Sequence, residues 1–172
     1  MTFRTLIVLF LLASTAVKAV GAEPVKIGLT LGLSGKYAAM ADMQIKGFRL
    51  WEKQVNSSGG LLGREIKIII YDDKSDPQTA KSLYEQLILS DKVDLLFGPY
   101  SSEIADAVFP VTEKYRYPVV SSGASSDSLF EKGYRYVFCT HTPASKIITG
   151  FLELLSLNGL NSIAIIHADD PF

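Results

Sequence analysis

The sequence predicts an α/β protein with a doubly wound parallel sheet that is covered by helices on both faces. From Val25 onward, short runs rich in β-branched residues alternate with longer stretches of helical periodicity. The run from Ile66 to Ile70 is apolar almost throughout, which is typical of a strand buried between two helix layers. A chain of 172 residues with 48% apolar and 20% charged residues can bury one ordinary core. We therefore expect one α/β unit.

Residues 1–22 precede this unit and have the pattern of a secretory signal peptide. Arg4 supplies a positive charge, residues 6–13 form an apolar run, and residues 20–22 (Val-Gly-Ala) resemble a cleavage site. The alternative is a membrane anchor, but the apolar stretch over 6–17 is about 12 residues long, whereas a spanning helix needs roughly 20. The sequence therefore predicts export to the periplasm.

The first two strand–helix units are expected over residues 25–90. A strand over 25–31 precedes a helix over 41–56, and a strand over 65–71 precedes a helix over 76–90. Asp76 and Pro77 favour a helix start, because aspartate caps a helix and proline is tolerated in its first turn. Five residues of the first helix are spaced to share one face: Met43, Gly47, Leu50, Trp51 and Val55.

Three more strands complete a five-stranded sheet and are expected over 94–98, 118–121 and 134–140. A helix over 102–115 separates the first two of these. We expect the strand order 2-1-3-4-5, with 3-2-1-4-5 as the alternative. A further helix over 143–157 and a sixth strand over 162–167 follow. No helix covers this last strand, so we expect a truncated chain.

Two successive strands end in small residues that can form hydrogen bonds. The carboxyl ends of parallel strands meet at one edge of a sheet, so these two turns should form half of a ligand pocket there, with Tyr37 nearby. Ser102 is expected to cap the helix over 102–115, whose first amides favour an anionic group. The candidate binding residues in the two turns are Tyr100, Ser101, Ser102, Gly123, Ala124 and Ser125.

The sequence offers no catalytic or metal constellation, and we expect neither an enzyme nor a cofactor. The carboxylates Asp72, Asp73 and Asp76 resemble a metal cluster, but a turn and a helix cap explain them better. His141 and His167 lie on different segments, so neither a metal pair nor a catalytic triad is expected.

The charge and the motifs exclude further classes of function. Removal of residues 1–22 takes away two of the 17 basic residues and leaves 15 against 18 acidic ones, a net charge near −3 that does not favour nucleic acid. The segment over 32–36 ends in Gly-Lys but lacks the first glycine and the hydroxyl of a phosphate-binding loop. Cys139 is the only cysteine, so no internal disulfide is expected.

Several runs of the sequence resemble the leucine-binding family of periplasmic solute-binding proteins. They are Val25–Leu29 with Leu33–Gly35, Asn56–Gly63, Tyr71–Asp73, Gly98–Ser102 and Tyr136–Phe138. The resemblance implies a type I periplasmic-binding-protein lobe. Members of this family serve ABC importers of amino acids and related solutes, and they have two α/β lobes hinged around a cleft. This chain resembles the first lobe over 23–141 and an incomplete start of the second lobe over 142–172.

The resemblance also implies roles for individual residues. Ser102 should meet the α-carboxylate of the ligand, Gly123 should offer a carbonyl to its ammonium group, and Ser125 should offer a hydroxyl and an amide. Met40 stands where some members have an aromatic residue, and Phe172 stands at the position of a second-lobe tyrosine.

The implied function is that of the extracytoplasmic solute-binding component of an ABC importer. Its partners would be a small amino acid or related solute and a membrane permease, and the protein would be a monomer if complete. The alternatives are a ligand-sensing module of the same fold and a gene fragment without function.

Overall fold

The computed structural model of the chain describes residues 23–160 and 162–166. Its centre is a five-stranded sheet in the order β2-β1-β3-β4-β5, and every neighbouring pair is parallel. The favoured strand order is therefore confirmed. The strands are β1 (Val25–Leu31), β2 (Ile66–Asp72), β3 (Leu95–Phe97), β4 (Val119–Ser121) and β5 (Val137–Cys139).

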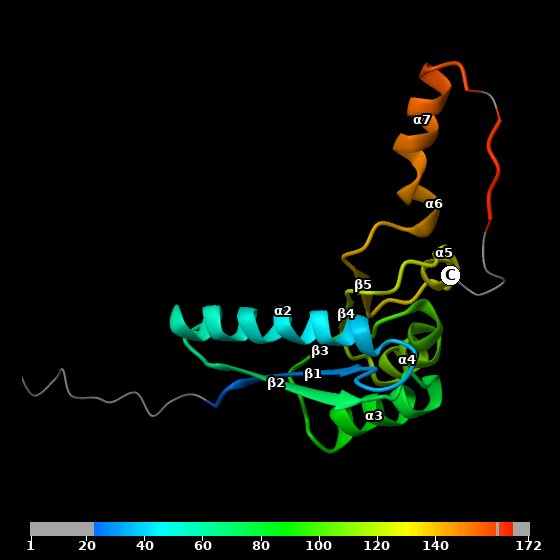
Figure 1. Cartoon of the computed structure of the whole chain (residues 1–172). Helices are drawn as coiled ribbons and strands as arrows, with labels where there is room; N and C mark the ends of the chain where they lie inside the picture. Colours follow the sequence, from blue (N-terminus) through cyan, green and yellow to red (C-terminus); the bar gives the residue numbers. More distant parts are fainter. Residues whose placement is uncertain (1–22, 161, 167–172) are drawn as a thin grey trace, which may run out of the picture.

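Helices cover the sheet on both faces (Figure 1). Helix α2 (Ala38–Ser57) runs along one face, and α3 (Pro77–Leu89) and α4 (Ser102–Tyr115) lie on the other. The core is accordingly divided into two clusters, one on each side of β1 and β3. Helix α5 (Asp127–Glu131) follows β4.

The cluster beneath α3 and α4 is the larger of the two and holds the two largest fully buried side chains, Tyr84 and Phe109. The hydroxyl of Tyr84 donates a hydrogen bond of 2.5 Å to the carbonyl of Phe97 at the end of β3. Burial raises the pKa of Tyr84 far above its usual value, so this hydroxyl stays protonated. The contact fixes the end of β3 just before the first serine turn.

Helix α2 packs on the sheet through a face that includes only part of the one that its spacing suggested. Trp51 and Val55, which were expected on that face, pack against the cluster on its side of the sheet, together with Ile45 and Phe48. Met43 and Leu50 are 63% and 57% exposed. The face that carries Met43 and Leu50 is therefore a flank of the helix and not its contact with the sheet.

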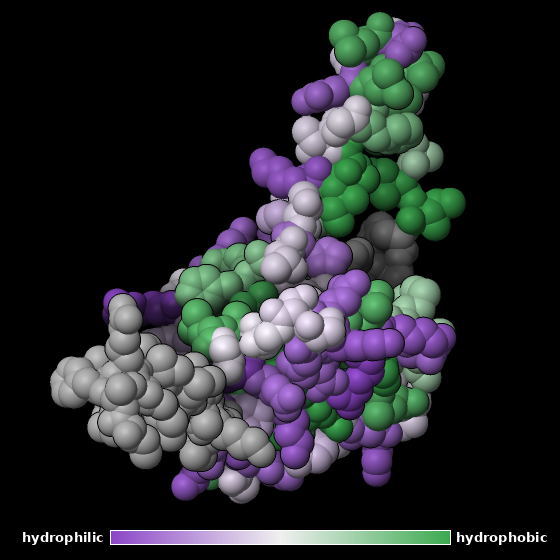
Figure 2. Space-filling model, turned by 90° about the vertical axis from the view of Figure 1, so that its left-hand side faces the viewer, coloured by the Kyte–Doolittle hydropathy of each residue, from purple (hydrophilic) through white to green (hydrophobic). Residues whose placement is uncertain are grey.

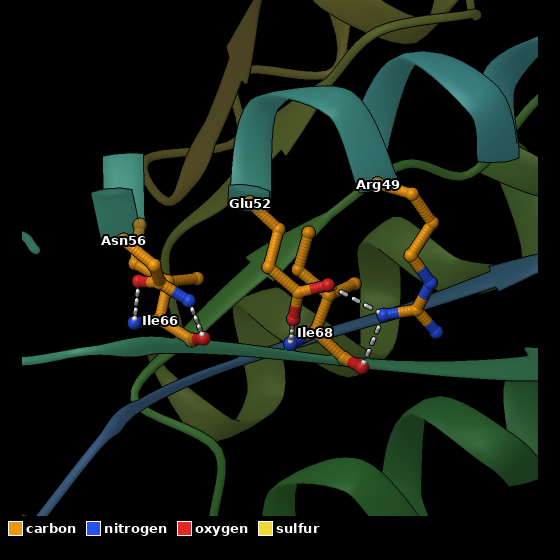
Figure 3. A network of polar contacts seen from close by, with 5 residues as sticks. All are labelled: Arg49, Glu52, Asn56, Ile66 and Ile68. Atoms are coloured by element: carbon orange, nitrogen blue, oxygen red, sulfur yellow. Dashed lines mark hydrogen bonds and ion pairs between the residues drawn. The ribbon is translucent and has the colours of Figure 1, made fainter. Parts of the chain in front are cut away.

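The opposite flank of α2 covers the outer edge of β2 (Figure 3). The Asn56 side chain accepts a 2.7 Å hydrogen bond from the amide of Ile66 and donates a 2.9 Å bond to the carbonyl of the same residue. Glu52 accepts a 2.7 Å bond from the amide of Ile68, whose carbonyl accepts a bond from Arg49. These side chains satisfy backbone groups that an edge strand would otherwise leave open.

The C-terminal elements leave the sheet as an arm. The helix expected over 143–157 is divided into α6 (Ala144–Ile147) and α7 (Thr149–Leu157), and neither contains a buried residue. Together they project away from the helix-covered sheet (Figure 1). The sixth strand expected over 162–167 is not formed over 162–166, because no neighbouring strand pairs with this segment; residue 167 lies outside the described residues.

The predicted signal peptide over 1–22 also lies outside the described residues. Within 23–160 and 162–166, no helix has both the length and the apolar character that a membrane span requires.

Candidate functional site

The two serine turns meet at the carboxyl ends of β3 and β4, as the sequence predicts. Tyr100 and Gly123 form a parallel bridge between the turns. The amide of Ser101 donates a 3.0 Å hydrogen bond to the carbonyl of Gly123. The structure thus brings six of the predicted site residues into one polar rim, which we define as Tyr100, Ser101, Ser102, Gly123, Ala124 and Ser125.

Gly123 allows the two turns to approach closely. A Cβ atom at this position would lie 2.7 Å from Cδ2 of Tyr100 and 3.0 Å from its Cα. The Tyr100 ring also makes an edge-to-face contact with Tyr37, with 5.4 Å between ring centroids. Tyr37 in turn donates a 3.3 Å hydrogen bond from its hydroxyl to Glu103 in the first turn of α4. The rim therefore carries an aromatic wall beside its hydroxyls.

The cap of α4 is Ser101 and not Ser102, so that prediction was wrong. The Ser101 hydroxyl oxygen accepts a 3.2 Å hydrogen bond from the amide of Ile104. Ser101 has φ 79° and ψ 144°, a backbone region that is populated almost only by glycine. The hydrogen bonds of its amide and hydroxyl hold it there, and the amides of Ser102 and Glu103 have no acceptor within the helix.

Ser102 instead connects the two turns. Its side chain is buried, and its hydroxyl oxygen accepts hydrogen bonds from the amides of Ser125 (3.3 Å) and Ser126 (3.1 Å). A serine hydroxyl has two acceptor positions and one donor. With both acceptor positions used, the hydroxyl is left as a donor, which suits a carboxylate oxygen.

Two substitutions at Ser101 separate the effect of its helix cap on stability from the effect of its strained backbone. Ser101→Ala removes the hydrogen bond to Ile104 and keeps the unfavourable φ, so we expect the free energy of unfolding to fall by about 1 kcal/mol or more. Ser101→Gly removes the same bond but relieves the strain, so it should cost less. Urea denaturation of both variants measures the difference, and a glycine variant less stable than the alanine variant would contradict it.

Ala124 and Ser125 of the rim also contact other elements, and two further predicted residues, Met40 and Phe172, are not part of the rim as defined. Ala124 is fully buried, and its carbonyl accepts a 3.3 Å bond from the Cys139 thiol. The carbonyl of Ser125 accepts a 2.8 Å bond from the amide of Ala144 at the start of α6. Met40 is 44% exposed in the first turn of α2. Phe172 lies outside the described residues.

Sequence reasoning missed the part that Ser126 plays in fixing Ser102. The amide of Ser126 makes the shorter of the two hydrogen bonds to the Ser102 hydroxyl, and its own hydroxyl lies 3.0 Å from that of Ser128. No sequence signal marks this, since the contact depends on how the two turns approach each other.

The three aspartates at the end of β2 and just after it hold the backbone in place. Asp76 caps α3 by accepting a 2.7 Å bond from the amide of Thr79, and this hydrogen bonding lowers its pKa. Asp73 is buried and accepts a 2.6 Å bond from the Thr30 hydroxyl; burial raises its pKa. Asp72 accepts bonds from the amide and hydroxyl of Ser34. Within 23–160 and 162–166, no group of three or more His, Cys, Asp or Glu residues is placed to hold a metal ion.

Comparisons with known proteins show the family of this chain. The family described as periplasmic binding protein matches residues 24–172. The leucine-specific-binding protein of Salmonella typhimurium is 27% identical over 147 residues, which are 85% of this chain and 40% of that protein. The Leu/Ile/Val-binding protein homolog 8 of Brucella suis is 30% identical over 144 residues, or 84% of this chain and 35% of that protein. The chain thus spans about two fifths of the curated relatives it matches.

Solved structures show the same fold. The branched-chain amino acid transporter substrate-binding protein LivJ of Streptococcus pneumoniae, in complex with isoleucine, is 31% identical with a TM-score of 0.69. The match covers 76% of this chain and 38% of LivJ. An ABC transporter substrate-binding protein of Desulfitobacterium hafniense has a TM-score of 0.77 at 20% identity, over 87% of this chain and 43% of its own. The chain therefore belongs to the periplasmic binding protein family, with the α/β fold of its type I members.

Proposed function

We propose that this chain is the amino-acid-binding lobe of an exported ABC transporter substrate-binding protein. The observation that carries the proposal is the Ser102 hydroxyl, whose two acceptor positions are used by the amides of Ser125 and Ser126. It is held as a donor beside the free amides at the start of α4, an arrangement suited to a carboxylate. The relatives are named for leucine, isoleucine and valine binding, so a branched-chain amino acid is the proposed ligand.

The other rim residues complete the proposed site. The Gly123 carbonyl, which already accepts a bond from Ser101, keeps a second lone pair for the ligand ammonium. Tyr37 and Tyr100 offer ring surface to an apolar side chain. Met40 and Phe172 remain proposed contacts of the ligand. The proposed role is binding without catalysis, with a membrane permease as the partner that accepts the solute.

This lobe alone should bind weakly. A hydrogen bond contributes a net ~1 kcal/mol, so three or four contacts from one side of a ligand give about −4 kcal/mol, which corresponds to a dissociation constant of about 1 mM. In a complete two-lobed protein, closure of the second lobe would exclude water and add contacts from the other side. A periplasmic location and a signal peptide over 1–22, both of them proposed, are consistent with this role.

An NMR titration with L-leucine tests the proposal on the purified chain. We expect amide shifts at residues 101–103 and 122–126 that saturate at millimolar ligand, and no such shifts with leucinamide, which lacks the carboxylate. Ser102→Ala should abolish the shifts. Thr79→Ala, which changes a hydroxyl at the distant start of α3, serves as the control and should keep them. The proposal would be contradicted if the chemical shifts of the rim amides did not change at a leucine concentration about ten times the expected dissociation constant.

A further inference from the structure

The turn between β2 and α3 fastens the loop between β1 and α2. Both segments follow the carboxyl ends of paired parallel strands, so they lie at the same edge of the sheet as the polar rim (Figure 1). The hydroxyl of Ser75 donates a 2.9 Å hydrogen bond to the carbonyl of Ser34 and accepts a 3.0 Å bond from the amide of Tyr37. One side chain of the turn thus holds the loop at two points. These polar contacts lie within the lobe, apart from the apolar surface of the projecting arm (Figure 2).

Ser75 is itself held in place by the sheet. It has φ 59°, a left-handed conformation that is costly for a residue with a side chain. Its amide donates a 2.9 Å hydrogen bond to Asp73, whose buried carboxylate also accepts the 2.6 Å bond from the Thr30 hydroxyl on β1. Gly32 leaves room for the serine, because a Cβ atom at Gly32 would lie 2.4 Å from the Ser75 hydroxyl oxygen. Ser75 therefore joins the loop to the sheet.

Tyr37 connects the loop to the polar rim. Its amide, bonded to Ser75, comes directly before the start of α2. Its ring contacts Tyr100 edge to face, and its hydroxyl donates to Glu103 in α4. A tyrosine side chain turns about only two bonds, so the position of its ring depends closely on the backbone that carries it. A shift of the loop backbone at Tyr37 would therefore move the aromatic wall of the rim.

We propose that Ser75 is a positioning residue for solute selection, which holds the Tyr37 ring as the wall against which an apolar solute side chain packs. This role rests on the proposed function. Leucine and glycine share the carboxylate and the ammonium group, so the hydrogen bonds of the rim treat them alike and the wall tells them apart. Loss of the wall should weaken the binding of leucine alone. Because the wall covers only part of the leucine side chain, the expected loss is about threefold.

NMR titrations of the purified chain with leucine and with glycine test this role. Ser75→Ala and Ser75→Gly both remove the hydroxyl, and each should raise the dissociation constant of leucine about threefold and leave that of glycine unchanged. The glycine variant relieves the positive φ and should be the more stable of the two, so an effect that followed stability would differ between them. Lys74→Ala is the control, because Lys74 is an exposed neighbour with φ 57°, and it should keep both constants.

A double-mutant cycle with Tyr37 tests whether Ser75 acts through the ring. Tyr37→Ala should weaken leucine at least as much as Ser75→Ala does, and it should leave glycine unchanged. In the Tyr37→Ala background, Ser75→Ala should have no further effect on leucine, since the ring that it positions is already gone. Additive losses of affinity would overturn the inference.

The contact between the two tyrosine rings gives a readout that needs no ligand. Nuclear Overhauser cross-peaks between the ring protons of Tyr37 and Tyr100 should be present in the parent chain and in Lys74→Ala, and they should weaken in both Ser75 variants. A parent chain that binds neither amino acid would contradict the proposed function, while weakened cross-peaks would still support the hold of Ser75 on the ring. Unchanged cross-peaks in both Ser75 variants, or an unchanged ratio of the leucine and glycine constants, would overturn the inference.

Discussion

Replacing Gly123 with alanine is expected to remove the proposed ligand binding at the polar rim and to lower the free energy of unfolding by about 1–3 kcal/mol. The added methyl group would lie 2.7 Å from the Tyr100 ring and 3.0 Å from its Cα. The backbone cannot move aside without breaking a hydrogen bond, because the Gly123 carbonyl accepts a 3.0 Å bond from the Ser101 amide. The two turns would separate, and the Ser102 hydroxyl would lose its fixed position.

Urea denaturation and the leucine titration measure the two effects of Gly123→Ala separately. Gly47→Ala is the matched control, since nothing lies within 4 Å of its added methyl group and alanine favours a helix by up to about 1 kcal/mol over glycine. The control should be at least as stable as the parent. If Gly123→Ala bound leucine with unchanged affinity, the close approach of the turns would not be needed for binding.

Asn56→Leu is expected to produce the largest loss of stability on the other side of the sheet, about 1–3 kcal/mol. Its amide is bonded to both the amide and the carbonyl of Ile66, at 2.7 and 2.9 Å, and leucine replaces neither bond. Asn56→Asp keeps an acceptor for the Ile66 amide and loses the donor to its carbonyl, so it should lie between the parent and the leucine variant.

Exposure of the β2 edge gives this prediction a second readout. An uncovered edge strand pairs readily with another chain, so Asn56→Leu should aggregate at temperatures where the parent stays in solution. Lys53→Leu adds the same apolar side chain at an exposed position of the same helix, and it controls for nonspecific aggregation caused by a surface leucine. Chemical denaturation and light scattering during heating report the two effects. Equal behaviour of the two leucine variants would show that Asn56 does not protect the edge.

The helices and strands of the sheet could be predicted because they carry strong local signals, whereas such signals did not rank the two candidate strand orders. Helix α4 begins at Ser102 and ends at Tyr115, as the spacing predicts, and Asp76 caps α3. The face of helix α2 that meets the sheet was harder to predict, because this helix carries two adjacent apolar stripes. Spacing shows that Met43 and Leu50 share a face, but only the packed structure shows that another face meets the sheet.

The candidate site was predictable in location and not in detail. That both turns meet follows from parallel strands, whose carboxyl ends lie at one edge. The sequence does not show which serine caps α4, since Ser101 and Ser102 offer the same hydroxyl. The choice depends on the positive φ of Ser101 and on the amides of Ser125 and Ser126, which come from a distant part of the chain.

The C-terminal segment shows that an apolar sequence pattern alone does not establish a strand. Residues 162–166 have the apolar pattern of a strand, yet none of them is paired, and Ile166 is 99% exposed. A helix completes its own hydrogen bonds, whereas a strand needs a neighbour that the pattern cannot supply.

Ser125 is shared between the rim and the arm. Its amide donates to Ser102, and its carbonyl accepts from Ala144, where α6 begins. One peptide segment thus holds both the polar rim and the base of the limb that departs from it. A substitution that displaces this segment, for instance to suit another proposed solute, would therefore also change the direction of the limb.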